Sequence, residues 1–177
     1  MINRIWLICP SIGTSDKRTR MVPHRPSNPV GKRGRERKDR FFPERSDGQA
    51  IALYLGLKLV ANGSIAIFCG RKSTAASVCE KAVENIGRGV PLPLPQEFSN
   101  QQEVARLHNL HIANLGSGAP ASQSAEYGIY SHHGNTPHGI RLAVEHAMRE
   151  NLVRFVVCTS TLAQGVNLPI RYLIVTS

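Results

Sequence analysis

The sequence predicts an α/β fold with a mainly parallel sheet, and three observations from residue 48 onward support it. Residues 64–69 (SIAIFC) form an apolar run of strand length, which a basic turn and a stretch with helical periodicity follow. The same order of strand, turn and helix returns at residues 127–149. Two further apolar runs, 154–158 and 171–176, flank a polar loop. Strands that alternate with amphipathic helices are typical of parallel sheets.

Residues 1–45 differ from the remainder in composition. The 177 residues carry a formal net charge of +10, and residues 1–48 hold 12 Lys and Arg against 5 Asp and Glu. A short strand is expected around Ile5–Ile8, but residues 11–43 lack an apolar period and are rich in Pro, Gly and Ser. Residues 1–45 are therefore predicted to be an extended or disordered segment. The alternative is a basic strip along a nucleic-acid path.

The first helix, strand and second helix follow in sequence. Ser46 or Asp47 can cap a helix that runs to about Val60 and presents a broad apolar face. Asn62-Gly63 ends this helix, and the strand 64–69 comes next. Gly70-Arg71-Lys72-Ser73 then turns the chain into a helix over residues 74–86, which stops at glycines.

Residues 90–126 are predicted to be a connector between the two halves of the fold. The PLPLP run at 91–95 favours extended backbone, residues 101–110 favour a short helix, and residues 116–124 favour a loop. His108 and His111 have no partner in the pattern that would support a catalytic role, so we interpret them as surface or packing histidines.

The pattern then resumes, with a strand near Tyr130, a helix over 137–149, and the two apolar runs. Neighbouring side chains on a strand point to opposite faces, so His132-His133 is a poor chelating pair. We expect one buried histidine and one on the ligand side of the sheet. The four cysteines show neither CxxC pairing nor a histidine at ligand spacing, which argues against a zinc site and a disulfide framework. Without an export signal or a span-length apolar run, a cytoplasmic protein with reduced thiols is expected.

Three polar loops should meet at one edge of the sheet, because ligands of open parallel sheets bind beyond the carboxyl ends of the strands. These loops are 70–73, 132–135 and 159–167. One is basic, one carries imidazoles beside a glycine, and one carries three hydroxyls followed by Gly165 and Asn167. All three supply hydrogen-bond donors and none supplies an apolar pocket. The edge is therefore better suited to a row of phosphates than to a small apolar ligand.

Residues 127–169 include the strand end His132-His133, then Arg141 and Val144-Glu145, and finally TSTLAQGVNLP at 159–169. This series resembles the second RecA-like domain of superfamily-two DEAD/DEAH-box helicases, most closely the Ski-type branch, and SIAIFCGRKS is similar to an earlier strand and loop of that domain. The resemblance implies that 46–177 is a partial RecA-like domain, a three-layer fold incomplete at its C-terminus. It is absent from residues 1–45.

The resemblance also implies roles for individual residues. The residues expected to approach the sugar-phosphate backbone of a bound strand are Arg71, Ser73, His133, Gly134, Thr159 and Ser160. Gly165 and Asn167 would lie toward the ATP ribose and phosphates. Arg141 and Glu145 are expected to pair with each other at helical spacing, with contact between Arg141 and a phosphate as the alternative. Asn135 stands where the family commonly has glycine.

The sequence contains neither a GxxxxGK[ST] phosphate loop nor a DExH or DEAD acidic box. Phosphoryl transfer needs both, so these residues alone are not expected to hydrolyse ATP. We expect this chain to be a fragment of an ATP-dependent helicase. The first RecA-like domain, in cis or as a neighbouring chain, would supply the Mg²⁺ ligands. The partner would be single-stranded or duplex nucleic acid. The alternative is a non-catalytic nucleic-acid-binding or regulatory module derived from a helicase domain.

Overall fold

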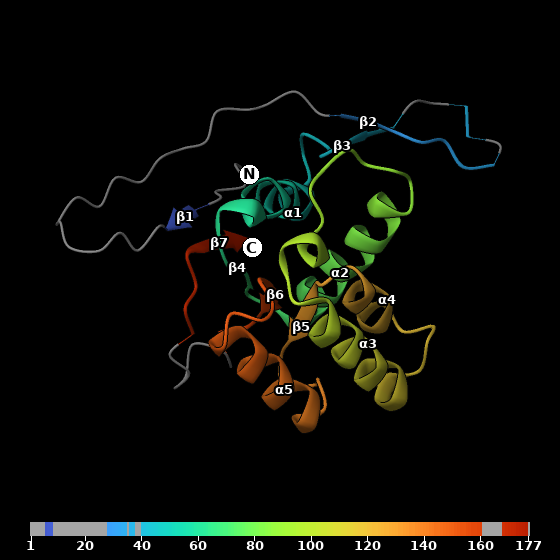
Figure 1. Ribbon diagram of the computed structural model, residues 1–177. Helices are drawn as coiled ribbons and strands as arrows, with labels where there is room; N and C mark the ends of the chain where they lie inside the picture. Colours follow the sequence, from blue (N-terminus) through green and yellow to red (C-terminus); the bar gives the residue numbers. More distant parts are fainter. Residues whose placement is uncertain (1–5, 9–27, 35, 38–39, 161–167, 177) are drawn as a thin grey trace, which may run out of the picture.

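A central sheet with helices on both faces forms the body of the protein (Figure 1). The computed structural model describes residues 6–8, 28–34, 36–37, 40–160 and 168–176. The strands are β1 (Trp6–Ile8), β2 (Asn28–Val30), β3 (Arg40–Phe42), β4 (Ile65–Cys69), β5 (Tyr130–His132), β6 (Phe155–Cys158) and β7 (Tyr172–Thr176). The helices are α1 (Gly48–Leu59), α2 (Lys72–Ile86), α3 (Gln101–Leu115), α4 (Pro120–Glu126) and α5 (His138–Arg149), with 3-10 turns at Val60–Asn62 and Pro95–Phe98.

The main sheet has the strand order β1-β7-β4-β6-β5. Strands β7, β4, β6 and β5 run parallel to one another, and β1 joins β7 antiparallel at the edge. Ile65 stands opposite both Phe155 and Tyr172 in the register. The predicted α/β class with a mainly parallel sheet is confirmed, and the arrangement is compatible with a RecA-like fold.

Successive residues of a strand pack against the helices on opposite faces of the sheet. On one face Ile65, Ile67 and Cys69 of β4 join the core cluster that includes α1 and α2. On the other face Ala66 joins the cluster that includes α3 and α5, with Phe68 packed against it. Because strands covered on both faces must be apolar throughout, the sequence shows continuous apolar runs here and no alternation.

Helix α1 begins where the sequence predicts. The Asp47 carboxylate accepts hydrogen bonds from the backbone N–H groups of Gln49 and Ala50, at 3.0 and 3.1 Å. Nζ of Lys81 on α2 also donates to Asp47, at 2.5 Å. Burial raises the pKa of Asp47, whereas the hydrogen bonds from these donors lower it. The net effect is a lowered pKa. One side chain therefore caps α1 and ties it to α2.

Within the basic N-terminal segment, β2 and β3 pair antiparallel and form a small second sheet. Val30 and Phe42 of these strands are buried in the core cluster with α1 and α2. Arg88, after α2, donates to both carboxylate oxygens of Glu36 at 2.8 and 2.9 Å and to the carbonyl of Gly31 at 3.0 Å. The hydrogen bonds from Arg88 lower the pKa of Glu36 to about 2. The strand expected near residues 5–8 is present as β1.

Residues 90–126 contain more helix than the sequence predicts. The short helix expected at 101–110 is confirmed and extends to Leu115 as α3. The loop expected at 116–124 is wrong, because α4 begins at Pro120. Its buried residues include Ser122, Ser124 and Ala125, which are too small or too polar to give the apolar period of a helix in the sequence. Within the described residues, no helix combines the length and apolar character needed to cross a bilayer.

Candidate functional site

The carboxyl ends of β4, β6 and β5 lie side by side, because these strands are adjacent and parallel in the sheet. The loops that follow the strands are in contact. The backbone N–H of Thr159, after β6, donates to the carbonyl of His132 at 3.1 Å. Nζ of Lys72, after β4, donates to Oδ1 of Asn135, after β5, at 2.8 Å. The structure thus brings the described parts of the three predicted loops together at one edge.

The loop after β4 leads directly into the N-terminus of α2. Arg71 is the N-cap residue, with extended backbone and without a side-chain capping hydrogen bond. Arg71, Lys72 and Ser73 are all exposed, and the first turn of this 15-residue helix contains no acidic residue. The first N–H groups of a helix lack intrahelical partners and carry partial positive charge. Two cationic side chains beside such a terminus make this part of the edge attractive to anions.

Lys72 connects two of the loops, although the sequence pattern singled out only its neighbours Arg71 and Ser73. A Cβ atom on Gly134 would lie 3.2 Å from Nζ of Lys72, so glycine leaves room for the ammonium group. The signal that could have found Lys72 is its place in the basic turn, but its partner lies 63 residues away in the chain. Asn135 does not adopt a left-handed conformation. Among the described non-glycine residues, only Asn151 has a positive φ.

The two adjacent histidines have different environments, as expected. His132 is 1% exposed, and its Nε2 lies 2.6 Å from Oε1 of Glu145 on α5. His133 is half-buried at the edge, where burial and the Lys72 ammonium lower the pKa of its imidazole. The predicted pairing of Arg141 with Glu145 is corrected. Glu145 pairs with His132, because the buried imidazole stands within reach, while Nη2 of Arg141 lies 3.5 Å from Nδ1 of His138.

The hydroxyl loop is described only in part. Thr159 is buried and Ser160 is exposed, so Ser160 presents its side chain to solvent at this edge. Residues 161–167 lie outside the described residues, and with them Gly165 and Asn167, for which an ATP-binding role is expected. Of the predicted strand-contacting residues, the structure therefore brings Arg71, Ser73, His133, Gly134 and Ser160 to the solvent side of one edge.

This edge supplies positive charge and hydrogen-bond donors, while the described residues show no arrangement for metal or thiol chemistry. No group of three or more His, Cys, Asp or Glu in the described ranges could hold a metal ion. Cys69, Cys79 and Cys158 are free and buried. Burial raises the pKa of Cys69 and Cys158 to about 12 and that of Cys79 to about 11, so these thiols stay protonated. The chemistry available to the described edge is anion binding.

Comparisons with known proteins found relatives of low sequence identity that are much longer than this chain. The chain is 25% identical over 152 residues to Hachiman protein HamB of Bacillus cereus, which covers 84% of the chain and 13% of that protein. It is 25% identical to the ATP-dependent DNA helicase Hel308 of Methanocella arvoryzae, over 66% of the chain and 15% of the helicase. It is 32% identical to the helicase POLQ-like of Caenorhabditis elegans, over 67% of the chain and 12% of that protein.

The aligned part of the chain thus spans 12–15% of the length of these three relatives. No protein-family model matches the chain. The three parallel strands with polar carboxyl ends and the similarity to two kinds of helicase support the assignment of this chain as a helicase-related domain.

Proposed function

We propose that this chain is the second RecA-like domain of a superfamily-two helicase of the Ski-type branch and holds the backbone of a nucleic-acid strand. The observation that carries the proposal is the meeting of three strand-end loops at one electropositive edge. There Lys72 contacts Asn135, and Arg71 stands exposed at the free N-terminus of α2. Phosphate oxygens accept hydrogen bonds and carry negative charge, so such an edge can bind them in a row.

The exposure of each residue indicates how it can contact the nucleic-acid strand. Arg71, Ser73 and Ser160 are exposed and can donate to phosphate oxygens. Gly134 is exposed and lets a strand approach the backbone closely, with the half-buried His133 beside it. Thr159 is buried and its backbone N–H already donates to the carbonyl of His132, so we assign Thr159 to shaping the loop that presents Ser160 to the strand.

ATP is proposed to bind between this domain and a first RecA-like domain, with Gly165 and Asn167 on this side of the cleft. The proposal is motivated by the similarity to a protein named as an ATP-dependent DNA helicase. The sequence holds neither a phosphate loop nor an acidic box. The Mg²⁺ ligands and the phosphate-loop lysine are therefore proposed to come from the first domain, in cis or on a neighbouring chain.

Strand binding is tested by fluorescence anisotropy with a single-stranded oligonucleotide at several salt concentrations. We expect Arg71→Glu to weaken binding by about ten-fold and to lower the slope of log affinity against log salt by about one. Lys58→Glu is the matched control, because Lys58 is an exposed cation in the last turn of α1. The proposal fails if the two reversals weaken binding equally, or if the unaltered chain has no affinity for the strand.

A further inference from the structure

A pocket lies at the opposite edge of the sheet, where the parallel strands begin. It has a volume of about 260 Å³ and is lined by Gly63, Ser64, Asn151, Arg154, Pro169 and Arg171. Gly63 and Ser64 precede β4, Arg154 precedes β6, and Arg171 precedes β7. Of the residues that line this pocket, Pro169 ends the helicase-like motif at 159–169, and the other five lie outside the motif residues assigned above.

The wall beside β7 is held by a closely connected set of hydrogen bonds. The Ser64 hydroxyl donates to the carbonyl of Pro169 and accepts from the backbone N–H of Arg171, at 3.1 Å in the latter case. The carbonyl of Ser64 accepts from the N–H groups of Arg171 and Tyr172 at 3.1 and 3.0 Å. These bonds satisfy Ser64 within the protein and fix the backbone from which the Arg171 side chain extends.

The side chain of Arg171 is positioned by two further contacts. A Cβ atom on Gly63 would come within 2.5 Å of Cδ of Arg171, so the arginine stem lies directly over the glycine. The guanidinium carbon is 5.7 Å from the centre of the Tyr172 ring, within the range of a cation–π contact. The opposite wall is held to the sheet at Arg154, whose carbonyl accepts from the N–H of Ile65 at 2.6 Å.

The charge of this pocket is unbalanced. Its lining contains two arginines and no carboxylate. Within the part of the chain that the structure describes, neither Arg154 nor Arg171 forms an ion pair. Arg40, Arg88 and Arg106, by contrast, pair with glutamates. Two arginines that line one concave site bring two like charges to it, and an anion bound there would offset that charge and accept hydrogen bonds from them.

Asn151 is a further polar residue that lines the pocket. It follows α5 with φ of 54°, and its backbone N–H donates to the carbonyl of Met148 at 3.1 Å. This left-handed position after a helix is one that glycine occupies readily. Replacement of Asn151 by glycine therefore removes the amide and keeps the backbone, which makes Asn151 a suitable test position.

We propose that this pocket binds a phosphate group through Arg154, Arg171 and Asn151. A phosphate group offers more acceptor oxygens than a single carboxylate, and each guanidinium can donate two parallel hydrogen bonds to it. The phosphate can belong to a nucleic-acid backbone or be free in solution. The site does not depend on the proposed strand-binding edge, from which it is separated by the length of the sheet.

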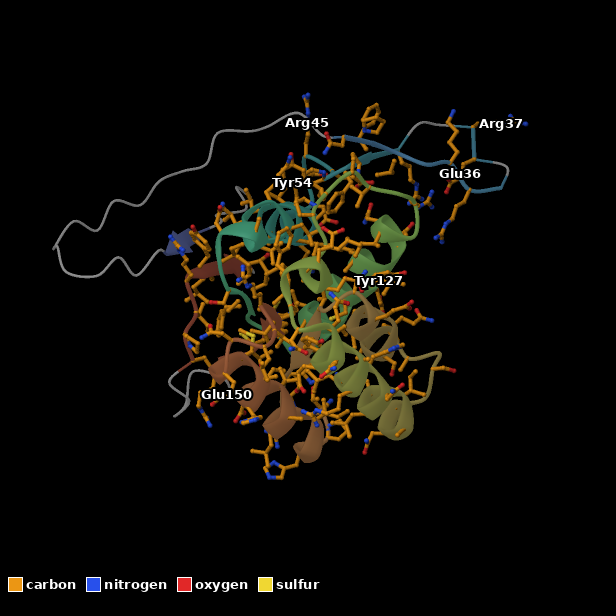
Figure 2. The ribbon with its side chains drawn as sticks, viewed as in Figure 1. Glu36, Arg37, Arg45, Tyr54, Tyr127 and Glu150 are labelled. Atoms are coloured by element: carbon orange, nitrogen blue, oxygen red, sulfur yellow. The ribbon has the colours of Figure 1, made fainter. Side chains whose placement is uncertain are left out.

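The test titrates inorganic phosphate into the full 177-residue chain and follows the Nε–Hε signals of arginine by NMR at constant ionic strength. We expect saturable shifts for the wild-type chain and an at least ten-fold weaker affinity for the double variant Arg154→Met, Arg171→Met. Methionine keeps the apolar stem over Gly63. Asn151→Gly is expected to weaken phosphate binding by a few-fold. Arg45→Met, at an exposed arginine that Figure 2 shows projecting away from the body of the protein, is expected to leave it unchanged.

Each outcome bears on the proposal. An absence of saturable shifts, or equal loss in the Arg45→Met control, overturns it. Equal affinity for acetate also overturns it and indicates a carboxylate-bearing partner instead. If the double variant does not fold, Arg171→Lys keeps the charge but loses the guanidinium fork, and an unchanged phosphate affinity then overturns the proposal.

Binding of a single-stranded oligonucleotide separates the two sources of phosphate. Parallel loss of oligonucleotide and phosphate affinity in the double variant supports a nucleic-acid backbone as the source. Loss of phosphate affinity alone supports a free phosphate. Because Arg71→Glu acts at the other edge, it is expected to leave phosphate binding at this pocket intact. Failure of the strand-binding proposal is therefore distinguishable from failure of this one.

Discussion

Nζ of Lys72 donates a 2.8 Å hydrogen bond to Oδ1 of Asn135 and thereby joins the loops after β4 and β5. Both side chains are exposed. The ammonium group is consequently engaged by a neutral acceptor within the protein at the place where a phosphate is proposed to bind. A bound strand would compete with Asn135 for this cation.

Removal of this competitor should strengthen strand binding. We expect Asn135→Gly to raise the affinity for a single-stranded oligonucleotide by about two- to five-fold, because an exposed hydrogen bond of this kind is weak. Asn135→Asp should act in the opposite direction, since it places a carboxylate beside Lys72. Anisotropy titrations measure both. Changes of the same sign in the two variants would contradict the assigned role of Asn135.

Strand binding should depend on pH through His133. Its pKa is lowered by burial and by Lys72, so the imidazole is neutral at pH 7 before the strand binds. A phosphate nearby favours the imidazolium and raises the pKa in the complex. Binding then takes up a proton, and affinity increases as pH falls from about 7.5 toward the pKa of the free chain. We expect His133→Asn to flatten this profile and His138→Asn to leave it in place. Identical slopes in all three proteins would rule out His133.

The buried His132–Glu145 pair should contribute to stability. Glu145→Ala leaves the Nε2 atom of a 1%-exposed imidazole without its partner, and the Nδ1 atom already has none among the described residues. Loss of a buried polar group's partner costs about 1–3 kcal/mol in the free energy of unfolding. Urea denaturation measures the change. Glu150→Ala, at an exposed glutamate (Figure 2), is the control and should change stability by less than about 0.5 kcal/mol.

Replacement of two helical glycines by alanine should change the stability of the fold in opposite directions. A Cβ on Gly56 in α1 would lie 2.7 Å from Cζ of Phe155, a buried ring, so we expect Gly56→Ala to destabilise the fold by about 1–3 kcal/mol. At Gly139 in α5 a Cβ meets nothing within 4 Å. Gly139→Ala should therefore stabilise the fold by up to about 1 kcal/mol. Thermal unfolding checks the pair, and stabilisation by both changes would contradict the packing of α1 on β6.

Strands β4 and β6 were predictable because they are buried on both faces. Such burial requires unbroken apolar runs, which stand out in the sequence. The start of α1 was also predictable, since Asp47 is a local capping signal. Helix α4 escaped prediction because Ser122 and Ser124 are buried without being apolar.

The loops of the site could be predicted, but their contacts could not. Strand ends are read from local sequence, and parallel topology then places them at one edge. The bond of Lys72 to Asn135 joins residues 63 positions apart, for which the sequence carries no local signal. The helical spacing in the sequence favoured Arg141 as the partner of Glu145. The imidazole of His132 prevailed because a buried polar ring needs a partner more than a partly solvated guanidinium does.

The pairing of β1 with β7 matters for how the protein behaves in solution. Leu7 stands opposite Ile174 in this antiparallel ladder, so three residues shield the outer backbone of β7. A shortened form that lacks residues 1–8 would present that row of N–H and C=O groups to other molecules. Unprotected edges of this kind invite strand-to-strand association between chains. The pairing of Trp6–Ile8 with β7 thus protects the chain against self-association at this edge.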